Sequence, residues 1–326
     1  MSNLDLAPAI AVCGGRSGVA AEPVRQVFAG RQVTLGAGTG VRRLLPNLGR
    51  RLVGPWCFVD HYGPDDIAAG PGMQVPPHPH IGLQTVSWLL DGEVLHRDSI
   101  GSERVVRPGD LGLMTAGRGI AHAEQSPDAH PAVLHGAQLW IALPDAHRDV
   151  EPAFEHHTDL PVLEDRGLLA TVLMGRLGGA VAPGTAYSPI VGADLAVRAG
   201  VERRLPLEPD FEHAVLTAAG VTEVDGVVLA PGSLLYLGCG RRDLTVRAAT
   251  DSRLLLLGGE PFAEKIVMWW NFVARTTEEV VDAREAWIQE TRLEGSRFGV
   301  VRGYDGDPLA PPPVPAGRLK PGGAVR

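Results

Sequence analysis

The sequence is poor in cysteine, has no long apolar run and carries no excess of positive charge. Its three cysteines, Cys13, Cys57 and Cys239, lie far apart and form no CxxC pair. This predicts neither a disulfide framework nor a structural zinc site, and it favours a reducing cytoplasm. No run of about 18 apolar residues occurs, so no helix should span a membrane. The net charge of -8 argues against a nucleic-acid binder that works through phosphate contacts.

Two further absences narrow the class of protein. The stretch MSNLDLAPAIAVCGG has no basic region before its apolar residues, so we expect no secretory signal and a cytoplasmic location. No GxSxG motif occurs, so the sequence lacks the nucleophile turn that serine hydrolases of the α/β class use. Glycine and proline are instead spread among many short apolar runs, and Asp91–Gly92 and Asp225–Gly226 are hairpin signals. This pattern predicts an all-β protein with frequent turns.

The chain is long enough, at 326 residues, to form two domains. The segments VVRPGDLGLM (105–114) and VVLAPGSLLYL (227–237) each combine a strand, a Pro-Gly turn and a second strand. Two copies of one β-barrel unit would explain this similarity, although such turns are common in β proteins. We expect an N-terminal arm (1–21), an N-terminal barrel (22–145), a connector (146–185), a C-terminal barrel (186–300) and a disordered, Pro/Gly-rich tail (301–326).

One segment near the C-terminus has helical periodicity. Thr276 and Glu279 fit a capping box, and apolar residues recur at helical spacing from Val280 to Trp287. We therefore predict a short helix over about 277–291.

The stretch QVPPHPHIGLQTV places His78 and His80 two residues apart, with Pro79 between them. Residues i and i+2 of a strand share one face, so both imidazoles should point the same way. Downstream, GRGIAHAEQS places His122 and Glu124 at the same spacing. A barrel that brings the two faces together would collect three imidazoles and one carboxylate. That set suits a divalent first-row transition metal, because it is too rich in nitrogen for calcium or magnesium and lacks the thiolates of structural zinc.

Other interpretations of these residues remain open at this point. A single HxH pair in a β protein is more often a surface or hydrogen-bonded pair than a metal site. If the strand continues with the same alternation, Gln84, Val86 and Trp88 share the histidine face. His96 and Asp98, also two apart, could support the site from an adjacent strand or form a structural hydrogen-bonded pair.

A longer pattern favours the metal site. Gly72, the two histidines, Gln84 and Gly92 resemble the first signature of the cupin superfamily, and PGD (108–110) followed by His122 resembles the second. The common cupin pattern has Glu at the position of Gln84. The motifs VDHYGP, PHPHIGLQTVSWLLDGEVLHRDS, RPGDLGLMTAGRGIAHAE and AQLWIALP together resemble the pirin family closely, and LLLLGGEPFAEKIVMWWNFVARTTEEVVDAREAW resembles the C-terminal part of bacterial pirin-like proteins.

The resemblance to pirins covers about residues 22–300 and implies a bicupin, two jelly-roll β-barrels face to face. It implies one metal in the N-terminal barrel, with iron(II) favoured over manganese, nickel, copper or zinc. The implied ligands are His78, His80, His122 and Glu124. Gln84 would then be an amide close to the ligands that does not touch the metal and lowers the negative charge there.

The C-terminal barrel is expected to hold no metal. Aligning APGSLLYL on RPGDLGLM places Thr245 and Arg247 where His122 and Glu124 stand. Its role would be to cover and stabilise the first barrel.

The resemblance implies two classes of function. The first is a quercetinase-type, flavonol 2,3-dioxygenase-like oxygenase, in which Glu124 is the catalytic base and Val86, Trp88 and Met114 line a pocket for a small aromatic or enolic substrate. The second is a metal- and redox-dependent regulatory protein that binds a transcription factor or a metabolic enzyme. We favour the enzyme, and we expect a monomer with no direct nucleic-acid or membrane partner. A metal-free bicupin is a third reading.

Overall fold

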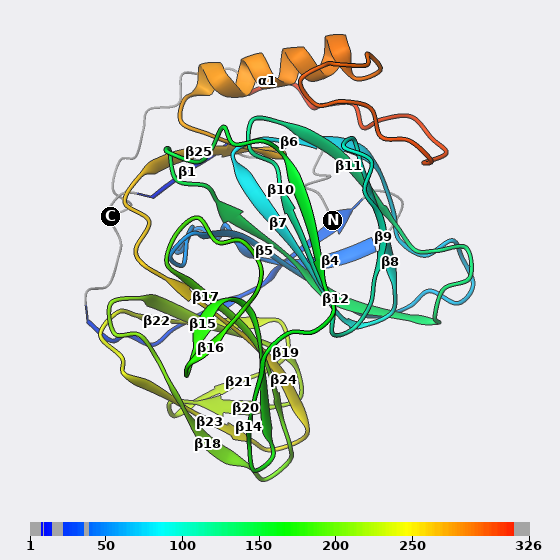
Figure 1. Cartoon of the computed structure of the whole chain (residues 1–326). Helices are drawn as coiled ribbons and strands as arrows, with labels where there is room; N and C mark the ends of the chain where they lie inside the picture. The colour runs from blue at the N-terminus through cyan, green and yellow to red at the C-terminus, as the bar shows by residue number, and fades with distance from the viewer. Residues whose placement is uncertain (1–7, 9, 15–21, 36–38, 316–326) are drawn as a thin grey trace.

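The computed structural model describes residues 8, 10–14, 22–35 and 39–315, and this part of the chain is built almost wholly of β-strands. Two sheet-rich units lie one above the other in Figure 1, and α1 (Thr277–Glu290), the single α-helix among these residues, runs over the outer side of the first unit. This confirms the predicted all-β bicupin with a short C-terminal helix. Within the described residues, no helix is both long enough and apolar enough to cross a membrane.

The first barrel consists of a seven-stranded sheet, in the order β13-β10-β7-β12-β5-β4-β3, and a four-stranded sheet, in the order β6-β11-β8-β9. All neighbouring strands in both sheets are antiparallel. The strands are β3 (Arg31–Leu35), β4 (Thr39–Leu45), β5 (Trp56–Asp66), β6 (Gln74–His80), β7 (Leu83–Asp91), β8 (Val94–Asp98), β9 (Glu103–Val106), β10 (Leu111–Thr115), β11 (Ile120–Gln125), β12 (Val133–Ala142) and β13 (Ala153–His157).

The second barrel repeats this plan. Its larger sheet has the order β14-β15-β17-β24-β19-β22-β2, with β16 paired to β15, and its smaller sheet has the order β18-β23-β20-β21. The strands are β2 (Gln26–Ala29), β14 (Val162–Asp165), β15 (Leu168–Leu177), β16 (Ala180–Val181), β17 (Ile190–Val197), β18 (Glu202–Pro206), β19 (Glu212–Ala219), β20 (Thr222–Val224), β21 (Val227–Leu229), β22 (Ser233–Gly238), β23 (Asp243–Ala248) and β24 (Ser252–Gly259).

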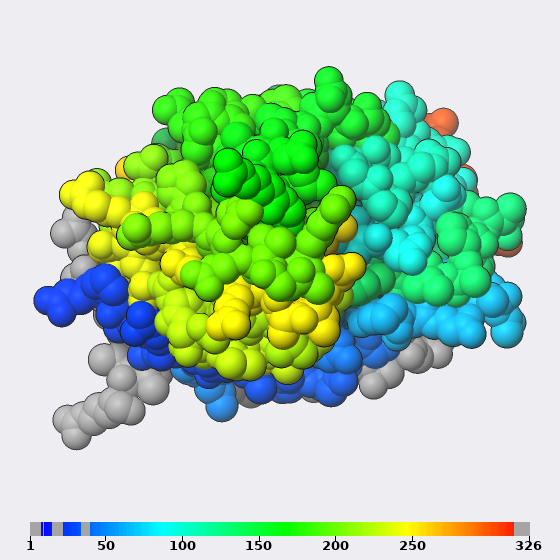
Figure 2. All heavy atoms as spheres, turned by 90° about the horizontal axis from the view of Figure 1, so that it is seen from below, coloured from blue at the N-terminus to red at the C-terminus, as the bar shows by residue number. Residues whose placement is uncertain are grey.

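Several segments cross the expected domain boundaries. β2, inside the range expected for the first barrel, pairs with β22 of the second, and Figure 2 shows blue N-terminal atoms beside the yellow-green atoms of that barrel. The expected connector, 146–185, carries β13, which pairs with β10, and β14 to β16, which belong to the second barrel. The physical reason is that β15 has buried apolar side chains at Leu168, Ala170 and Val172, which a solvent-exposed connector would lack.

The chain returns to the first barrel after β24. β25 (Lys265–Trp269) and β26 (Phe272–Ala274) form a small sheet with β1 (Ala11–Gly14), which lies within the range expected to be an arm. The predicted helix is confirmed as α1, and the Glu279 N–H donates to the Thr276 hydroxyl, 3.1 Å away, as a capping box requires. Trp287 is among the residues that α1 buries.

Part of the predicted disordered tail is ordered. The Leu309 N–H donates to the Pro77 carbonyl, 2.8 Å away, and the Trp287 indole N–H donates to the Leu309 carbonyl, also at 2.8 Å. Proline-rich composition alone missed this, because the segment is ordered by partners on α1 and β6 rather than by contacts within itself. Residues 316–326 lie outside the described residues.

The two barrels meet through the outer faces of their larger sheets. Val86 and Trp88 of β7 pack there with Leu255 and Leu257 of β24. The Trp88 indole N–H donates to Asp194 of the second barrel at 3.0 Å. The expectation that Val86 and Trp88 line the metal pocket is therefore wrong. Our third lining candidate, Met114, does belong to the inner cluster of the first barrel.

The reason for this error is a change of phase between β6 and β7. Gly82 has a φ of +69°, and β6 and β7 belong to different sheets on its two sides. A Cβ at this glycine would lie 2.1 Å from the Val273 carbonyl oxygen, so the kink also needs the close approach that only glycine permits. Alternation restarts after the kink, and it sends Ser87 inward and Trp88 outward.

We expect Trp88→Phe to lower the free energy of unfolding by about 1–3 kcal/mol, because it removes a buried hydrogen bond to a carboxylate at the interface of the barrels. Metal affinity should be unchanged. Trp140→Phe is a matched variant on the opposite face of the same sheet, and within the described part of the chain its indole N–H has no hydrogen-bond partner to lose. Denaturant unfolding and metal titration check both. A large loss of metal affinity in Trp88→Phe would contradict this placement.

Candidate metal centre

The four predicted ligands come from two neighbouring strands. β6 and β11 are antiparallel, and their register sets His122 opposite His78. β6 lies at the edge of its sheet, which is why it tolerates Pro79 between the two histidines. All four side chains are buried, with at most 1% of any of them exposed.

Three imidazoles converge on one point inside the first barrel. The Nε2 atoms of His80 and His122 are 3.1 Å apart, and the ring centroids of His78 and His122 are 4.3 Å apart. One ring nitrogen from each of the three lies within 4.8 Å of the others. Nε2 of His78 is buried and has no hydrogen-bond partner among the residues that the structure describes. Such an orphaned acceptor is costly in a protein interior unless something binds it, and a cation between the three nitrogens would satisfy it.

The outward-facing nitrogens fix the tautomers of two ligands. Nδ1 of His78 lies 2.8 Å from the Pro76 carbonyl, and Nδ1 of His80 lies 2.9 Å from the Asn271 carbonyl. A carbonyl oxygen can only accept, so each Nδ1 carries the proton and each Nε2 presents its lone pair to the common point. Trp270, with a φ of +53°, forms the turn that presents the Asn271 carbonyl.

Burial keeps the three imidazoles neutral. It lowers the pKa of His78 to about 4. Burial, followed by the neighbouring imidazoles, lowers the pKa values of His80 and His122 well below the usual range. Neutral imidazole is the form that binds a metal, so the site is in its binding form at neutral pH.

Glu124 lies beside this cluster rather than in it. Its carboxylate belongs to a second group with one nitrogen each of His96 and His122, all within 4.8 Å. The Ser87 hydroxyl lies 3.0 Å from Glu124 Oε1 and donates to it. Oε1 of Gln138 lies 3.1 Å from the same hydroxyl. Ser87 and Gln138 escaped the sequence analysis, and only the change of phase at Gly82 would have pointed to Ser87.

Gln84 is not beside the metal ligands, in contrast to the expectation. Its Nε2 donates to Thr115 Oγ1 and to the Thr185 carbonyl, both at 3.0 Å. Because alternation restarts after Gly82, Gln84 shares the outward face with Val86 and Trp88. Its amide therefore joins the barrels and does not tune the charge at the metal site.

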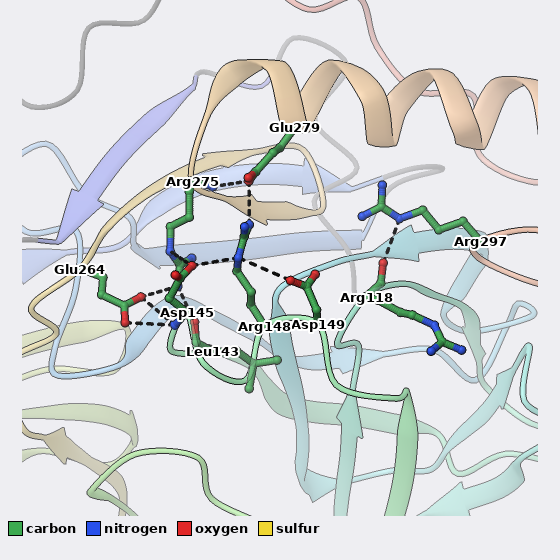
Figure 3. Close-up of polar contacts among 9 residues, drawn as sticks. All are labelled: Arg118, Leu143, Asp145, Arg148, Asp149, Glu264, Arg275, Glu279 and Arg297. Atoms are coloured by element: carbon green, nitrogen blue, oxygen red, sulfur yellow. Dashed lines mark hydrogen bonds and ion pairs between the residues drawn. The ribbon is translucent and has the colours of Figure 1, made fainter.

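A cluster of ion pairs holds the C-terminal hairpin against the first barrel (Figure 3). Arg148 Nη1 lies 2.8 Å from Glu279 Oε2, at the start of α1. The Arg275 guanidinium donates to the Leu143 carbonyl at 2.8 Å, and the Asp145 N–H donates to the Glu264 carboxylate. These contacts join the 143–149 loop to the segment on both sides of β25 and β26, and so they fix the hairpin that carries Asn271.

The second barrel has no comparable cluster among the residues that the structure describes. On β23, which occupies the place of β11, Leu244, Val246 and Ala248 are buried, whereas Thr245 and Arg247 are partly or fully exposed. The ungapped alignment was therefore one residue out of register. The face that corresponds to His122 and Glu124 is apolar and can offer no ligand.

Comparison with known proteins agrees with this geometry. The family profile described as Pirin matches residues 38–141, and the profile described as Pirin C-terminal cupin domain matches residues 192–293. A Pseudomonas aeruginosa protein named "Putative quercetin 2,3-dioxygenase" is 47% identical over 295 residues, which cover 90% of this chain and 92% of that protein. A "Pirin-like protein" of Caulobacter vibrioides is 37% identical over 268 residues, which cover 80% of this chain and 92% of that protein.

A solved structure is similar over nearly the same length. The crystal structure of quercetin 2,3-dioxygenase from Acinetobacter baumannii has a TM-score of 0.87 and 42% sequence identity to this chain. The match covers 91% of this chain and 98% of that one.

We expect a divalent metal at about 100 times its Kd to raise the free energy of unfolding by about 2.7 kcal/mol, since binding stabilises only the folded state. A chelator should reverse the effect, and His80→Ala should abolish it. His157→Ala is the control, because His157 is half-buried on β13 and its Nε2 lies 3.1 Å from Glu155, outside the imidazole cluster. Thermal melting with and without metal measures the shift. An undiminished shift in His80→Ala would contradict the site.

The two positions at which a carboxylate could serve the metal should respond differently. Glu124→Gln should weaken metal binding with little loss of folding stability in the metal-free protein. Gln84→Glu should leave metal affinity intact but destabilise the fold by about 1–3 kcal/mol, because a carboxylate would face the Thr185 carbonyl in place of a donor. Parallel metal titration and denaturant unfolding separate the two effects. A loss of metal affinity in Gln84→Glu would argue against the outward placement of Gln84.

Proposed function

The chain belongs to the pirin family, and on that basis we propose that it is a metal-dependent dioxygenase of the quercetinase type, which opens the ring of a flavonol or a related enol with O2. The observation that carries this proposal is the convergence of three neutral, buried imidazoles on one point of the first barrel. The names of the 47% identical and 42% identical proteins support the reaction class.

The proposed ligands are His78, His80, His122 and Glu124, with one metal per chain. Three imidazoles and a carboxylate suit iron(II), and manganese, nickel, copper and zinc bind the same donor types, so the donor set limits the metal to this group. When bound, the metal supplies Lewis acidity and redox chemistry with dioxygen. Four protein ligands leave room on an octahedral ion for a substrate oxygen.

Glu124 is the proposed base for the enol proton of the substrate. It is buried, and the Ser87 hydroxyl holds one of its oxygens at 3.0 Å. A carboxylate held in this way beside His122 is placed to accept a proton from a substrate hydroxyl at the imidazoles. Loss of that proton makes the enol oxygen anionic and the ring more electron-rich, which favours its reaction with O2.

The inner face of the larger sheet supplies an apolar, aromatic environment for a flat substrate. Phe58 and Trp140 stack with their ring centroids 4.0 Å apart, and Met114 belongs to the same buried cluster. The Trp140 ring meets the His80 ring edge to face, with the centroids 5.2 Å apart. These residues replace Val86 and Trp88 as the proposed apolar lining, and they would keep water away from the reacting enol.

Oxygen consumption by the iron-loaded protein tests this proposal. We expect uptake with quercetin and none with simple catechols that lack the flavonol enol, because only the former offers an acidic enol next to the bond that is cleaved. His122→Ala should abolish turnover and His157→Ala should retain it. Glu124→Gln, assayed at a metal concentration that saturates it, should lower turnover by about 100-fold or more through loss of the base. No uptake by metal-saturated protein, together with a protein partner that binds only one oxidation state, would reject the enzyme and favour a redox-dependent regulator.

A further inference from the structure

The outward-facing nitrogen of His122 has a different kind of partner from those of His78 and His80. Those two face backbone carbonyls, whereas Nδ1 of His122 lies 3.4 Å from Nδ1 of His96. Nε2 of His96 in turn lies 3.2 Å from Asp98 Oδ2. His96, Asp98 and His122 are each at most 3% exposed, so water does not compete for these contacts.

Only one arrangement of protons satisfies this chain of contacts with neutral rings. The Asp98 carboxylate can only accept, so Nε2 of His96 carries its proton. Nδ1 of His96 is then a lone pair, and it can only accept the proton on Nδ1 of His122. This leaves Nε2 of His122 as a lone pair, and that atom lies 3.1 Å from Nε2 of His80, at the point where the three imidazoles meet.

The pair that sets this arrangement is itself held firmly. Oδ1 of Asp98 accepts backbone N–H groups from Ile100 at 3.1 Å and Ser102 at 2.8 Å, which leaves Oδ2 free for His96. The His96 ring stacks on Phe154, with centroids 4.1 Å apart and an angle of 7° between the planes. His96 and Asp98 both lie on β8, which is paired with β11, and the register of this pair places them beside His122.

We propose that Asp98 and His96 are positioning residues that fix the tautomer and ring orientation of His122, and so set the strength with which its Nε2 binds the metal. Of the three imidazoles, His122 alone is connected to a carboxylate through its outward nitrogen in the part of the chain that the structure describes. The Asp98 carboxylate, acting through His96, increases the electron density on the His122 ring. Nε2 of His122 therefore binds a metal more strongly than it would if Nδ1 faced a backbone carbonyl. The inference rests on the proposed metal site but on no particular substrate.

A rival reading uses the same atoms. His96, His122 and Glu124 could themselves hold a second cation, because one donor atom of each lies within 4.8 Å of the others. A cation there would take the place of the proton between His96 and His122. The two readings therefore differ in stoichiometry, with one metal per chain for the positioning pair and two for the rival.

Asp98→Asn is the decisive variant. The asparagine oxygen can still accept the Ile100 and Ser102 N–H groups, but its amide would donate to Nε2 of His96. His96 would then carry its proton on Nδ1 and would force Nδ1 of His122 to accept, which puts the His122 proton on the metal-binding nitrogen. We expect the affinity for Ni(II), a probe that does not change its oxidation state in air, to fall by about 10–100-fold.

The double variant separates positioning from a merely structural role. His96→Phe keeps the ring stacked on Phe154 but removes the acceptor, and we expect it to weaken Ni(II) binding as well. If Asp98 acts through His96, adding Asp98→Asn to His96→Phe should change the affinity by less than about 2-fold. If Asp98 only shapes the turn at Ile100 and Ser102, its effect should persist undiminished in the double variant, which would overturn the proposal.

Asp110→Asn is the matched control. Asp110 of the same barrel also accepts a backbone N–H, from Arg107, and a histidine Nε2, from His156, both at 3.1 Å, but that histidine does not reach the metal site. Its Ni(II) affinity should be unchanged. Melting of the metal-free variants reports folding. Unchanged affinity in Asp98→Asn, or two Ni(II) ions per wild-type chain, would reject the inference. Because no substrate is present, failure of the dioxygenase assay leaves this test unaffected.

Discussion

Three neutral imidazole nitrogens can face one another in a dry barrel only when the outward nitrogen of each ring has a partner of its own. Lone pairs at 3.1 Å repel, and burial prevents the rings from relieving that repulsion by taking up protons. The surroundings resolve this by holding each ring from behind. The Pro76 carbonyl, the Asn271 carbonyl and Nδ1 of His96 each accept a hydrogen bond from one Nδ1–H group, and Asp98 holds His96 in place. The three Nε2 lone pairs are then left for a cation.

Much of the rest of the structure serves this arrangement. The register of β6 and β11 brings the ligands together, and the Asn271 carbonyl comes from a hairpin held by Arg148, Arg275 and Glu279 at the start of α1. The second barrel covers the outer face of the larger sheet, where Trp88 is anchored on Asp194. It thereby allows β7 to be buried on both faces, with Ser87 toward the metal site and Gln84 toward the neighbouring barrel.

The sequence was most informative where a single local rule applies. Alternation within one strand paired His78 with His80 and His122 with Glu124, and the capping box at Thr276 located α1. It failed where two rules compete, because a glycine kink at Gly82 restarts the alternation, and so Gln84, Val86 and Trp88 were assigned to the wrong face. Gln138 and Asn271 could not have been found without the fold, since strand pairing and the returning hairpin bring them to the site, and Ser87 would have needed recognition of the kink at Gly82. The predictions of a connector over 146–185 and of a disordered tail failed for the same reason. These segments are ordered by partners that lie far away in the sequence.

The returning hairpin has a consequence for how this protein is made. The carbonyl that orients His80 lies 191 positions further along the chain. During translation, the first barrel therefore emerges from the ribosome long before the peptide group that finishes its binding site. A nascent chain can form the β6–β11 pair early. The hydrogen bond that orients His80 must await synthesis of the second barrel and of β25 and β26. The binding site is therefore completed late in biogenesis, after the segment that carries Asn271 has been made.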